Sequence, residues 1–296
     1  MEYVSVCEKG FAKINLHLDI VGRLDGGYHS VKTVMQAVSI WDEVTVTLTE
    51  CGYSAECDVP GVPTDEKNIA VRAVRLYCET IGSDCGAHIK IQKNIPMAAG
   101  MAGGSADAAA ALRAINHLHG DVLTLPELCA IGSKLGADVP FCIVGGTAYA
   151  DGKGDELHYM TEMPDVAIVA ACEGEGVSTP WAYGLLDEIY NDFDAQGGYV
   201  PHDTELLASA LKSSDARAIA DSMYNIFEAP VLEARPVAAD VRRVMLESGA
   251  LGAMMSGSGP SVFGIFASDE DAERAAEALC AAGYRPYICR PVGKIG

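Results

Sequence analysis

Apolar and polar residues alternate along much of the first half of the chain, which is the pattern of half-buried β-strands. The alternation predicts five strands, over residues 3–7, 11–22, 31–40, 42–50 and 87–95. Residues 24–27 (Leu-Asp-Gly-Gly) predict a turn and residues 51–66 a loop. A helical spacing of apolar residues follows over 68–82, with Asn68 at the N-cap position.

Helical segments become more frequent beyond residue 100. We expect helices over residues 105–119 and 126–135, a strand and a turn over 137–152, and a buried strand over 165–171. Four further helical segments begin at Ser178, Asp203, Asp215 and Pro236. The remaining pattern is strand, strand, helix, strand, over residues 250–256, 261–267, 270–283 and 284–290.

This order of elements predicts an α+β fold of two domains, residues 1–158 and residues 159–296. The 49% of hydrophobic residues is enough for sizeable cores and excludes a disordered chain. No apolar run reaches the roughly 18 residues of a membrane helix, and the first residues do not resemble a secretory signal.

The ten cysteines contain no Cys-x-x-Cys pair, which indicates reduced thiols and a cytoplasmic protein. A Cys51–Cys57 disulfide is the alternative. The net charge of −20 repels nucleic acid and anionic membranes, so neither is an expected partner. We expect a monomer or a homodimer that acts on a small molecule.

The stretch NIPMAAGMAGGSADAAAAL, residues 94–112, joins a predicted strand to a predicted helix through a loop rich in glycine and alanine. Gly100, Gly103 and Gly104 allow close approach of the backbone to a ligand. Ser105 is expected at the helix N-cap, where unpaired N–H groups and the helix dipole favour an anion. The spacing is neither a Walker A motif nor Gly-x-Gly-x-x-Gly. The alternative is an ordinary strand-to-helix connection, which Asp107 in the first turn would suit.

Three further segments add to this loop: FAKINLHLDIVGRLDGGYHSVKTVMQ at 11–36, GADVPFCIVGGTAYADGKG at 136–154 and MSGSGPSVFGIF at 255–266. Together, and in this order, they resemble the GHMP kinase superfamily from about residue 8 to residue 290. Within it they are most similar to the members that phosphorylate CDP-methylerythritol in the non-mevalonate isoprenoid pathway. The resemblance implies ATP and Mg²⁺ as cofactors and transfer of phosphate to the 2-hydroxyl group of that substrate.

The resemblance also implies a fold, a β-rich N-terminal α/β domain and a ferredoxin-like C-terminal domain with the active site between them. Another GHMP kinase, of the homoserine or mevalonate type, is the alternative enzyme. A non-catalytic sugar- or nucleotide-binding relative is the alternative of another class. The presence of Lys13 and Asp138 argues against such a relative.

Lys13 and Asp138 are the catalytic residues that the resemblance implies. Asp138 would accept the proton of the substrate hydroxyl, and Lys13 would pair with Asp138 and with the transferring phosphate. From the sequence alone, Lys13 could be a surface lysine on an alternating strand. Asp138, at an expected extended exit from a helix, could be a loop or capping residue.

The resemblance places ATP against the loop and two residues outside it: Pro96, Met97, Ala98, Ala99, Gly100, Met101, Ala102, Gly103, Gly104, Ser105, Ala106, Lys93 and Asn68. Ser105 is the implied magnesium residue. A strand-end lysine and a helix cap explain Lys93 and Asn68 equally well. Ala106 stands where related kinases carry a second serine, whose loss would weaken phosphate binding by ~1 kcal/mol.

The substrate residues implied by the resemblance are Asn15, Tyr28, His29, Thr179, Tyr183, Gly257, Ser258 and Gly259. Tyr28 and Tyr183 would be the aromatic walls around cytosine, His29 would bind the base, and Trp181 competes with Tyr183. An extra glycine precedes Tyr28 compared with the usual Asp-Gly-Tyr-His. Core packing of the Tyr28-His29 pair and a plain hairpin turn at 257–259 are the alternatives.

Overall fold

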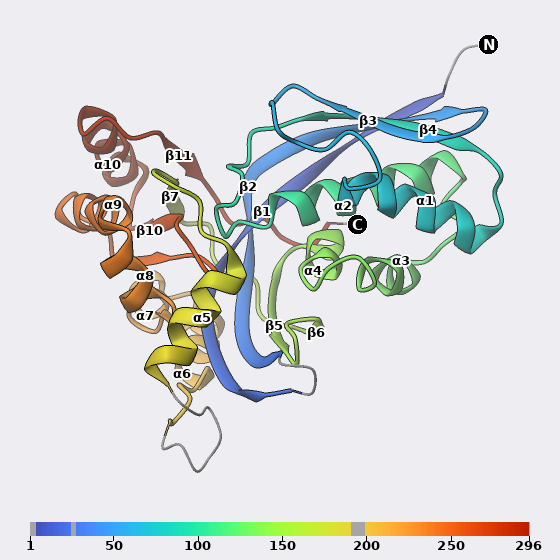
Figure 1. Ribbon diagram of the computed structural model, residues 1–296. Helices are drawn as coiled ribbons and strands as arrows, with labels where there is room; N and C mark the ends of the chain where they lie inside the picture. The colour runs from blue at the N-terminus through green and yellow to red at the C-terminus, as the bar shows by residue number, and fades with distance from the viewer. Residues whose placement is uncertain (1–3, 25–27, 191–198, 296) are drawn as a thin grey trace.

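The computed structural model of the protein describes residues 4–24, 28–190 and 199–295. The chain forms two α+β halves joined by long curved strands, as Figure 1 shows. The predicted turn over residues 24–27 falls mostly outside the described residues. In the part of the chain that is described, no helix is long and apolar enough to cross a membrane.

The N-terminal sheet is built on an antiparallel pair of long strands, β1 (Ser5–Arg23) and β2 (His29–Thr49). Strand β1 joins the strands predicted over residues 3–7 and 11–22, and β2 joins those over 31–40 and 42–50. The hydrogen-bonded pairing of β1 with β2 continues through register shifts such as the one at Phe11/Ala12. The sheet order is β3-β4-β2-β1-β8, and β5 pairs with β2 and β6. The bounds of the shorter strands are β3 Tyr53–Cys57, β4 Gly86–Gln92, β5 Thr147–Asp151, β6 Glu156–Tyr159 and β8 Tyr224–Asn225.

Strand β3 lies inside the segment predicted as a loop, and its parallel pairing with β4 is a long-range contact that local sequence does not encode. Cys51 and Cys57 are both free thiols, so the alternative of a disulfide between them is wrong.

The described residues of the N-terminal half include four helices: α1 (Ile69–Ile81), α2 (Gly103–Leu118), α3 (Leu125–Gly132) and α4 (Val139–Val144). Helix α2 contacts β1, β2, α1 and α4, and all four consecutive alanines 108–111 are fully buried. The prediction of a strand over 137–152 is wrong for its first part. The six apolar residues of α4 are buried on every side, so they show no alternation that would reveal a helix.

The C-terminal half has a four-stranded antiparallel sheet in the order β11-β7-β10-β9. Its strands are β7 (Ala167–Ala171), β9 (Gly252–Met255), β10 (Val262–Phe266) and β11 (Pro286–Cys289). In chain order this is the 4-1-3-2 arrangement of a ferredoxin-like domain, which confirms the expected fold class. The helices are α5 Thr179–Ile189, α6 Glu205–Ser213, α7 Ala216–Asp221, α8 Glu228–Ala234, α9 Pro236–Glu247 and α10 Asp269–Ala281.

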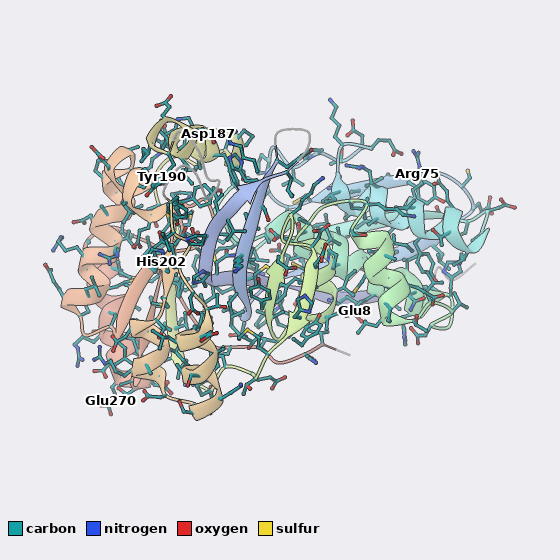
Figure 2. The ribbon with its side chains drawn as sticks, turned by 90° about the horizontal axis from the view of Figure 1, so that it is seen from below. Glu8, Arg75, Asp187, Tyr190, His202 and Glu270 are labelled. Atoms are coloured by element: carbon teal, nitrogen blue, oxygen red, sulfur yellow. The ribbon has the colours of Figure 1, made fainter. Side chains whose placement is uncertain are left out.

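The two halves are connected at more than one place. Strand β8 pairs with β1, and the chain returns at its end so that Val292 N–H donates to Ala37 and Ile295 N–H donates to Val144. Charged side chains cover both halves, with Arg75 and Glu270 at opposite ends of the molecule (Figure 2). The division at residue 158 stays a prediction.

Candidate active site

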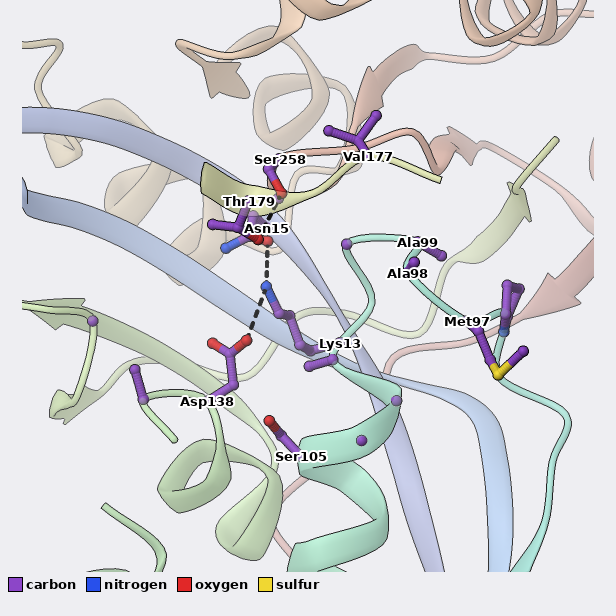
Figure 3. Close-up of a pocket in the computed structure, with 18 of the residues that line it drawn as sticks. Lys13, Asn15, Met97, Ala98, Ala99, Ser105, Asp138, Val177, Thr179 and Ser258 are labelled. Carbon is purple, nitrogen blue, oxygen red and sulfur yellow. Dashed lines mark hydrogen bonds and ion pairs between the residues drawn. The ribbon is translucent and has the colours of Figure 1, made fainter. Parts of the chain in front are cut away.

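A cavity of about 620 Å³ lies where the two halves meet. Strand β1, the loop before α2, the start of α4 and the segments around Thr179 and Ser258 contribute to its wall (Figure 3). Residues far apart in the sequence therefore meet here. The predicted site residues that line the cavity are Lys13, Asn15, Lys93, Pro96, Met97, Ala98, Ala99, Gly100, Ala102, Gly103, Gly104, Ser105, Asp138, Thr179, Tyr183, Gly257 and Ser258.

Lys13 and Asp138 face each other in this cavity. The Lys13 side chain is buried, so the alternative of a surface lysine is wrong. Its Nζ donates to Asn15 Oδ1 at 2.7 Å and lies 3.8 Å from Asp138 Oδ2. Figure 3 shows Lys13 between these two partners. An ammonium beside a carboxylate in a partly enclosed cavity is a suitable arrangement for phosphoryl transfer.

Asp138 is the N-cap residue of α4, with helical backbone angles (φ −78°, ψ −14°), so the expected extended conformation is wrong. Its side chain makes no capping hydrogen bond. The side chain is 37% exposed and lines the cavity. The carboxylate is thus directed to the cavity while the backbone begins the helix.

The loop before α2 presents its backbone to the cavity. Ala98, Gly100 and Ala102 all have positive φ, and Ala102 rather than Ser105 is the N-cap of α2. The helix starts two residues earlier than predicted because Gly103 and Gly104 adopt helical angles. Ser105 still lines the cavity, as the third residue of the helix, and lies below Lys13 in Figure 3. The first-turn N–H groups of α2 remain available to an anion.

Three residues of the expected ATP set do not line the cavity: Met101 and Ala106 are buried, and Asn68 caps α1. The Asn68 side chain accepts from Ala70 N–H at 2.9 Å and donates to the Pro63 carbonyl at 2.7 Å. The explanation of Asn68 as a helix cap is confirmed, and its contact with ATP stays a prediction.

Lys93 lies between two carboxylates. Its Nζ donates to Asp42 and, at 2.8 Å, to Asp107. The other oxygen of Asp42 accepts the N–H groups of Asn94 and Ile95, which begin the loop. Burial raises the pKa of Asp107, and the neighbouring Asp42 carboxylate adds to this rise while Lys93 opposes it. The charge of Lys93 is therefore satisfied within the protein.

Of the residues expected around cytosine, His29 and Tyr183 form an aromatic cluster beside the cavity, whereas Tyr28 contacts Lys153. The rings of His29 and Tyr183 are stacked with centroids 4.8 Å apart, and His29 Nε2 lies 2.9 Å from Asp187 Oδ1. Burial raises the pKa of Tyr183 to about 12, so its hydroxyl is neutral. Tyr28 is 58% exposed, and the alternative that it packs in the core is wrong. Of this cluster, Tyr183 lines the cavity.

The glycine segment before β10 closes the cavity from the C-terminal half. Thr179 Oγ1 and Ser258 Oγ are 3.3 Å apart, which joins this segment to α5. Gly100 and Gly257 lie against each other: a Cβ on Gly100 would be 2.3 Å from the Ser256 carbonyl oxygen, and one on Gly257 would be 3.0 Å from that of Gly100. Gly259 packs on Met255 rather than lining the cavity.

Several cavity residues were not identified from the sequence. Lys153 lines the cavity and its Nζ lies 4.2 Å over the Tyr28 ring, although it belongs to the quoted segment 136–154. Thr33 lines the cavity from β2. Its position follows from strand alternation, two residues after Val31, but no motif marks it.

The described residues contain no cluster of three or more His, Cys, Asp or Glu side chains able to hold a metal ion. Mg²⁺ in kinases keeps several waters and is bound largely by substrate phosphates, so it does not need such a cluster. The Ser105 hydroxyl group, on the cavity wall at the start of α2, fits a phosphate-bound magnesium ion.

Comparisons with known proteins agree with the fold. The chain matches the models of the GHMP kinases N terminal domain, over residues 68–146, and GHMP kinases C terminal, over residues 207–285. These define a class of kinases, and the chain belongs to the GHMP kinase family. It is an ATP-dependent phosphotransferase.

Within the family, the chain is similar to proteins named 4-diphosphocytidyl-2-C-methyl-D-erythritol kinase. That of Acetivibrio thermocellus is 40% identical over 292 residues, covering 99% of this chain and 100% of the relative. The crystal structure of a 4-(cytidine 5'-diphospho)-2C-methyl-D-erythritol kinase has a TM-score of 0.80 at 32% identity, with 97% and 100% of the two chains covered. A homoserine kinase from Cytophaga hutchinsonii shares the fold, with a TM-score of 0.74 at 23% identity, over 98% of this chain and 95% of that one.

Proposed function

We propose that this kinase transfers the γ-phosphate of ATP to the 2-hydroxyl group of 4-diphosphocytidyl-2-C-methyl-D-erythritol, a step of non-mevalonate isoprenoid synthesis. The observation that carries the proposal is the Lys13–Asp138 pair, 3.8 Å apart, beside the N-terminus of α2. The similarity to kinases named for this substrate supports its identity.

In the proposed mechanism, Asp138 accepts the proton of the attacking hydroxyl group. Lys13 offsets the negative charge that develops on the transferring phosphoryl group. The backbone N–H groups at the start of α2 hold the donor phosphates, and Ser105 would hold the magnesium ion together with them. A bound Mg²⁺ ion would neutralise part of the negative charge of the donor phosphates.

The cytidine end of the substrate would occupy the side of the cavity formed by Tyr183, with His29 stacked behind it. Tyr28 and Lys153 stand near the same mouth and would close over the base. An aromatic wall favours a nucleobase over the small aliphatic alcohols homoserine and mevalonate. This cluster therefore supports the cytidylyl substrate over the alternative kinases.

The test is ADP release by the purified protein with Mg-ATP and each of three alcohols: the cytidylyl substrate, homoserine and mevalonate. We expect turnover on the cytidylyl substrate alone and a fall in kcat of about 10²-fold or more in Asp138→Asn. Turnover on another alcohol would refute the proposed substrate. Full activity of Asp138→Asn would refute the base.

A further inference from the structure

A continuous chain of hydrogen bonds leads from Lys13 away from the cavity. Lys13 Nζ donates to Asn15 Oδ1 at 2.7 Å, and Asn15 Nδ2 donates to Thr33 Oγ1 at 2.8 Å. The Thr33 hydroxyl group then donates to the backbone carbonyl of His17 at 2.7 Å. Lys13, Asn15 and Thr33 are all buried, so the chain lies within the protein.

The direction of every bond in this chain is the same from either end, because the Lys13 ammonium can only donate. A backbone carbonyl can only accept, so the single hydroxyl hydrogen of Thr33 must point to His17. The Thr33 oxygen can then only accept, and Asn15 must turn its NH₂ group toward it. The carbonyl oxygen of the Asn15 amide consequently faces Lys13. The hydroxyl of Thr33 thus supports the amide orientation that suits an ammonium group.

Thr33 is itself fixed by the sheet. It lies on the central strand β2, opposite Leu18 of β1 on one side and Ala150 of β5 on the other. A residue with ladder partners on both sides has little freedom to shift. The Thr33 hydroxyl oxygen is therefore a hydrogen-bond acceptor in a fixed position for the Asn15 amide.

Two groups compete for the Lys13 ammonium. Asp138 attracts it electrostatically, yet the Nζ–Oδ2 distance of 3.8 Å is too long for a hydrogen bond. Asn15 holds the same nitrogen at 2.7 Å. An ammonium that closed on the carboxylate would cover the oxygen that has to receive the hydroxyl proton. The separation seen here leaves that oxygen open.

We propose that Thr33 is a positioning residue of the kinase: by orienting the amide of Asn15, it holds Lys13 away from Asp138 and ready for the phosphoryl group. Thr33 acts through Asn15 and has no chemical step of its own. The inference rests on the proposed roles of Lys13 and Asp138.

The test compares Thr33→Val, which keeps the β-branched shape but removes the hydroxyl, with Thr33→Ser, which keeps the hydroxyl. We expect kcat to fall about tenfold or more in Thr33→Val, which is the loss of one oriented interaction in the transition state. The KM values for ATP and for the alcohol should stay within about twofold. Thr33→Ser should recover most of kcat, and Thr45→Val, on the same strand outside the cavity, should match the wild type.

Wild-type kcat in Thr33→Val, or a Thr33→Ser variant as slow as Thr33→Val, would overturn the inference. Crystal structures of both variants give a second readout that does not depend on turnover. We expect Lys13 Nζ to move to about 3 Å from Asp138 Oδ2 in Thr33→Val only. An unchanged distance would also overturn it. If the wild type phosphorylates a different alcohol, the proposed substrate fails, and the same variants are assayed on that alcohol.

Discussion

At the scale of single residues, the surroundings of a lysine determine what it can do in this cavity. Lys13 has a neutral amide and a more distant carboxylate as partners. Lys93 is held directly by two carboxylates. The first lysine keeps charge available for a ligand, and the second holds the start of the loop to β2 through Asp42. Two lysines of the same wall therefore have different roles.

Tyr183 should contribute to binding of the nucleobase and not to the chemical step. Tyr183→Leu removes the ring that we propose packs against the nucleobase, and an aromatic pair is worth about 0.5–1.5 kcal/mol. We expect KM for the cytidylyl substrate to rise about two- to tenfold, with kcat and KM for ATP unchanged. Steady-state kinetics check this, and Tyr183→Phe, which keeps the ring, is the matched control. A fall in kcat alone would contradict the assignment.

His17 should make the fold less stable in mild acid. Burial lowers its pKa from 6.5 to about 4, and the charges of His202 and Lys32 add to this. Between these two values the unfolded chain takes up a proton that the folded protein does not, so stability falls as the pH falls. At pH 5 the loss amounts to about 2 kcal/mol relative to pH 7.

Urea unfolding at pH 7 and pH 5 checks this prediction when His17→Phe is measured beside the wild type. Carboxylates titrate in both proteins, so the difference between the two pH-dependent losses isolates His17. We expect the variant to lose about 2 kcal/mol less than the wild type. Equal losses in the two proteins would show that His17 does not titrate as its burial implies.

Motif residues could be assigned to a common site from the sequence, because a recognisable order of segments implied a common cavity. The residues that contact these motif residues and determine their charge state could not be predicted from the sequence. Asp42 and Asp107 are remote from Lys93 in the sequence, and neither belongs to a pattern that predicts an ion pair. The role of Thr33 could not be predicted from the sequence either, since it depends on a hydrogen bond to a neighbouring strand.

At the scale of elements, helix α2 determines how closely the loop before it can lie to β1. Its buried alanines have no side chain beyond Cβ, so the helix packs directly on the sheet. Gly10 on β1 completes this contact: a Cβ there would lie 2.5 Å from the carbonyl oxygen of Ala106. The N-terminus of α2 is thereby held next to the strand that carries Lys13.

Gly10→Ala should destabilise the protein because the backbone of α2 cannot move away from the new methyl group cheaply. Overpacking of this kind costs about 1–3 kcal/mol. Gly22→Ala, on the same strand with no atom within 4 Å of the added Cβ, is the control and should change stability by less than about 1 kcal/mol. Denaturant midpoints of the two variants check this, and equal midpoints would contradict the close packing.

The elements were predictable where the pattern was strongly periodic, as for α1 and α10. The prediction failed for α4, because burial on all sides removes the alternation of apolar and polar residues that reveals a helix. It also failed for β3, because this strand is stabilised by pairing with β4, which lies far away in the sequence. The sequence predicts β1 in two pieces because Glu8, Lys9 and Gly10 interrupt the alternation, yet these residues pair in register with β2.

At the scale of the whole molecule, a net charge of −20 surrounds a site that has to bind an anionic nucleotide. The long-range field repels ATP, so binding depends on local N–H groups and lysines. Salt screens the repulsion over a Debye length that shortens from about 30 Å at 0.01 M to about 8 Å at 0.15 M.

We therefore expect kcat/KM for ATP to increase when KCl is raised from about 0.01 to about 0.15 M, as encounter becomes less unfavourable. Initial rates at low ATP and constant free Mg²⁺ measure the effect. An uncharged osmolyte at the same osmolality should leave kcat/KM unchanged. A steady decrease with salt would show that the local cations, and not the net charge, control the approach of ATP.

The contact between Gly100 and Gly257 connects the loop before α2, which we propose binds the phosphate donor, to the glycine segment from the other half of the molecule. Neither loop can change its backbone path without meeting the other, and Ser256 donates its hydroxyl to the Gly100 carbonyl as well. A ligand that orders one loop on binding therefore also restricts the other loop. The entropic cost of ordering the second loop is then smaller when the second ligand binds. Donor and acceptor should consequently bind with synergy, each raising the affinity of the other by the same factor.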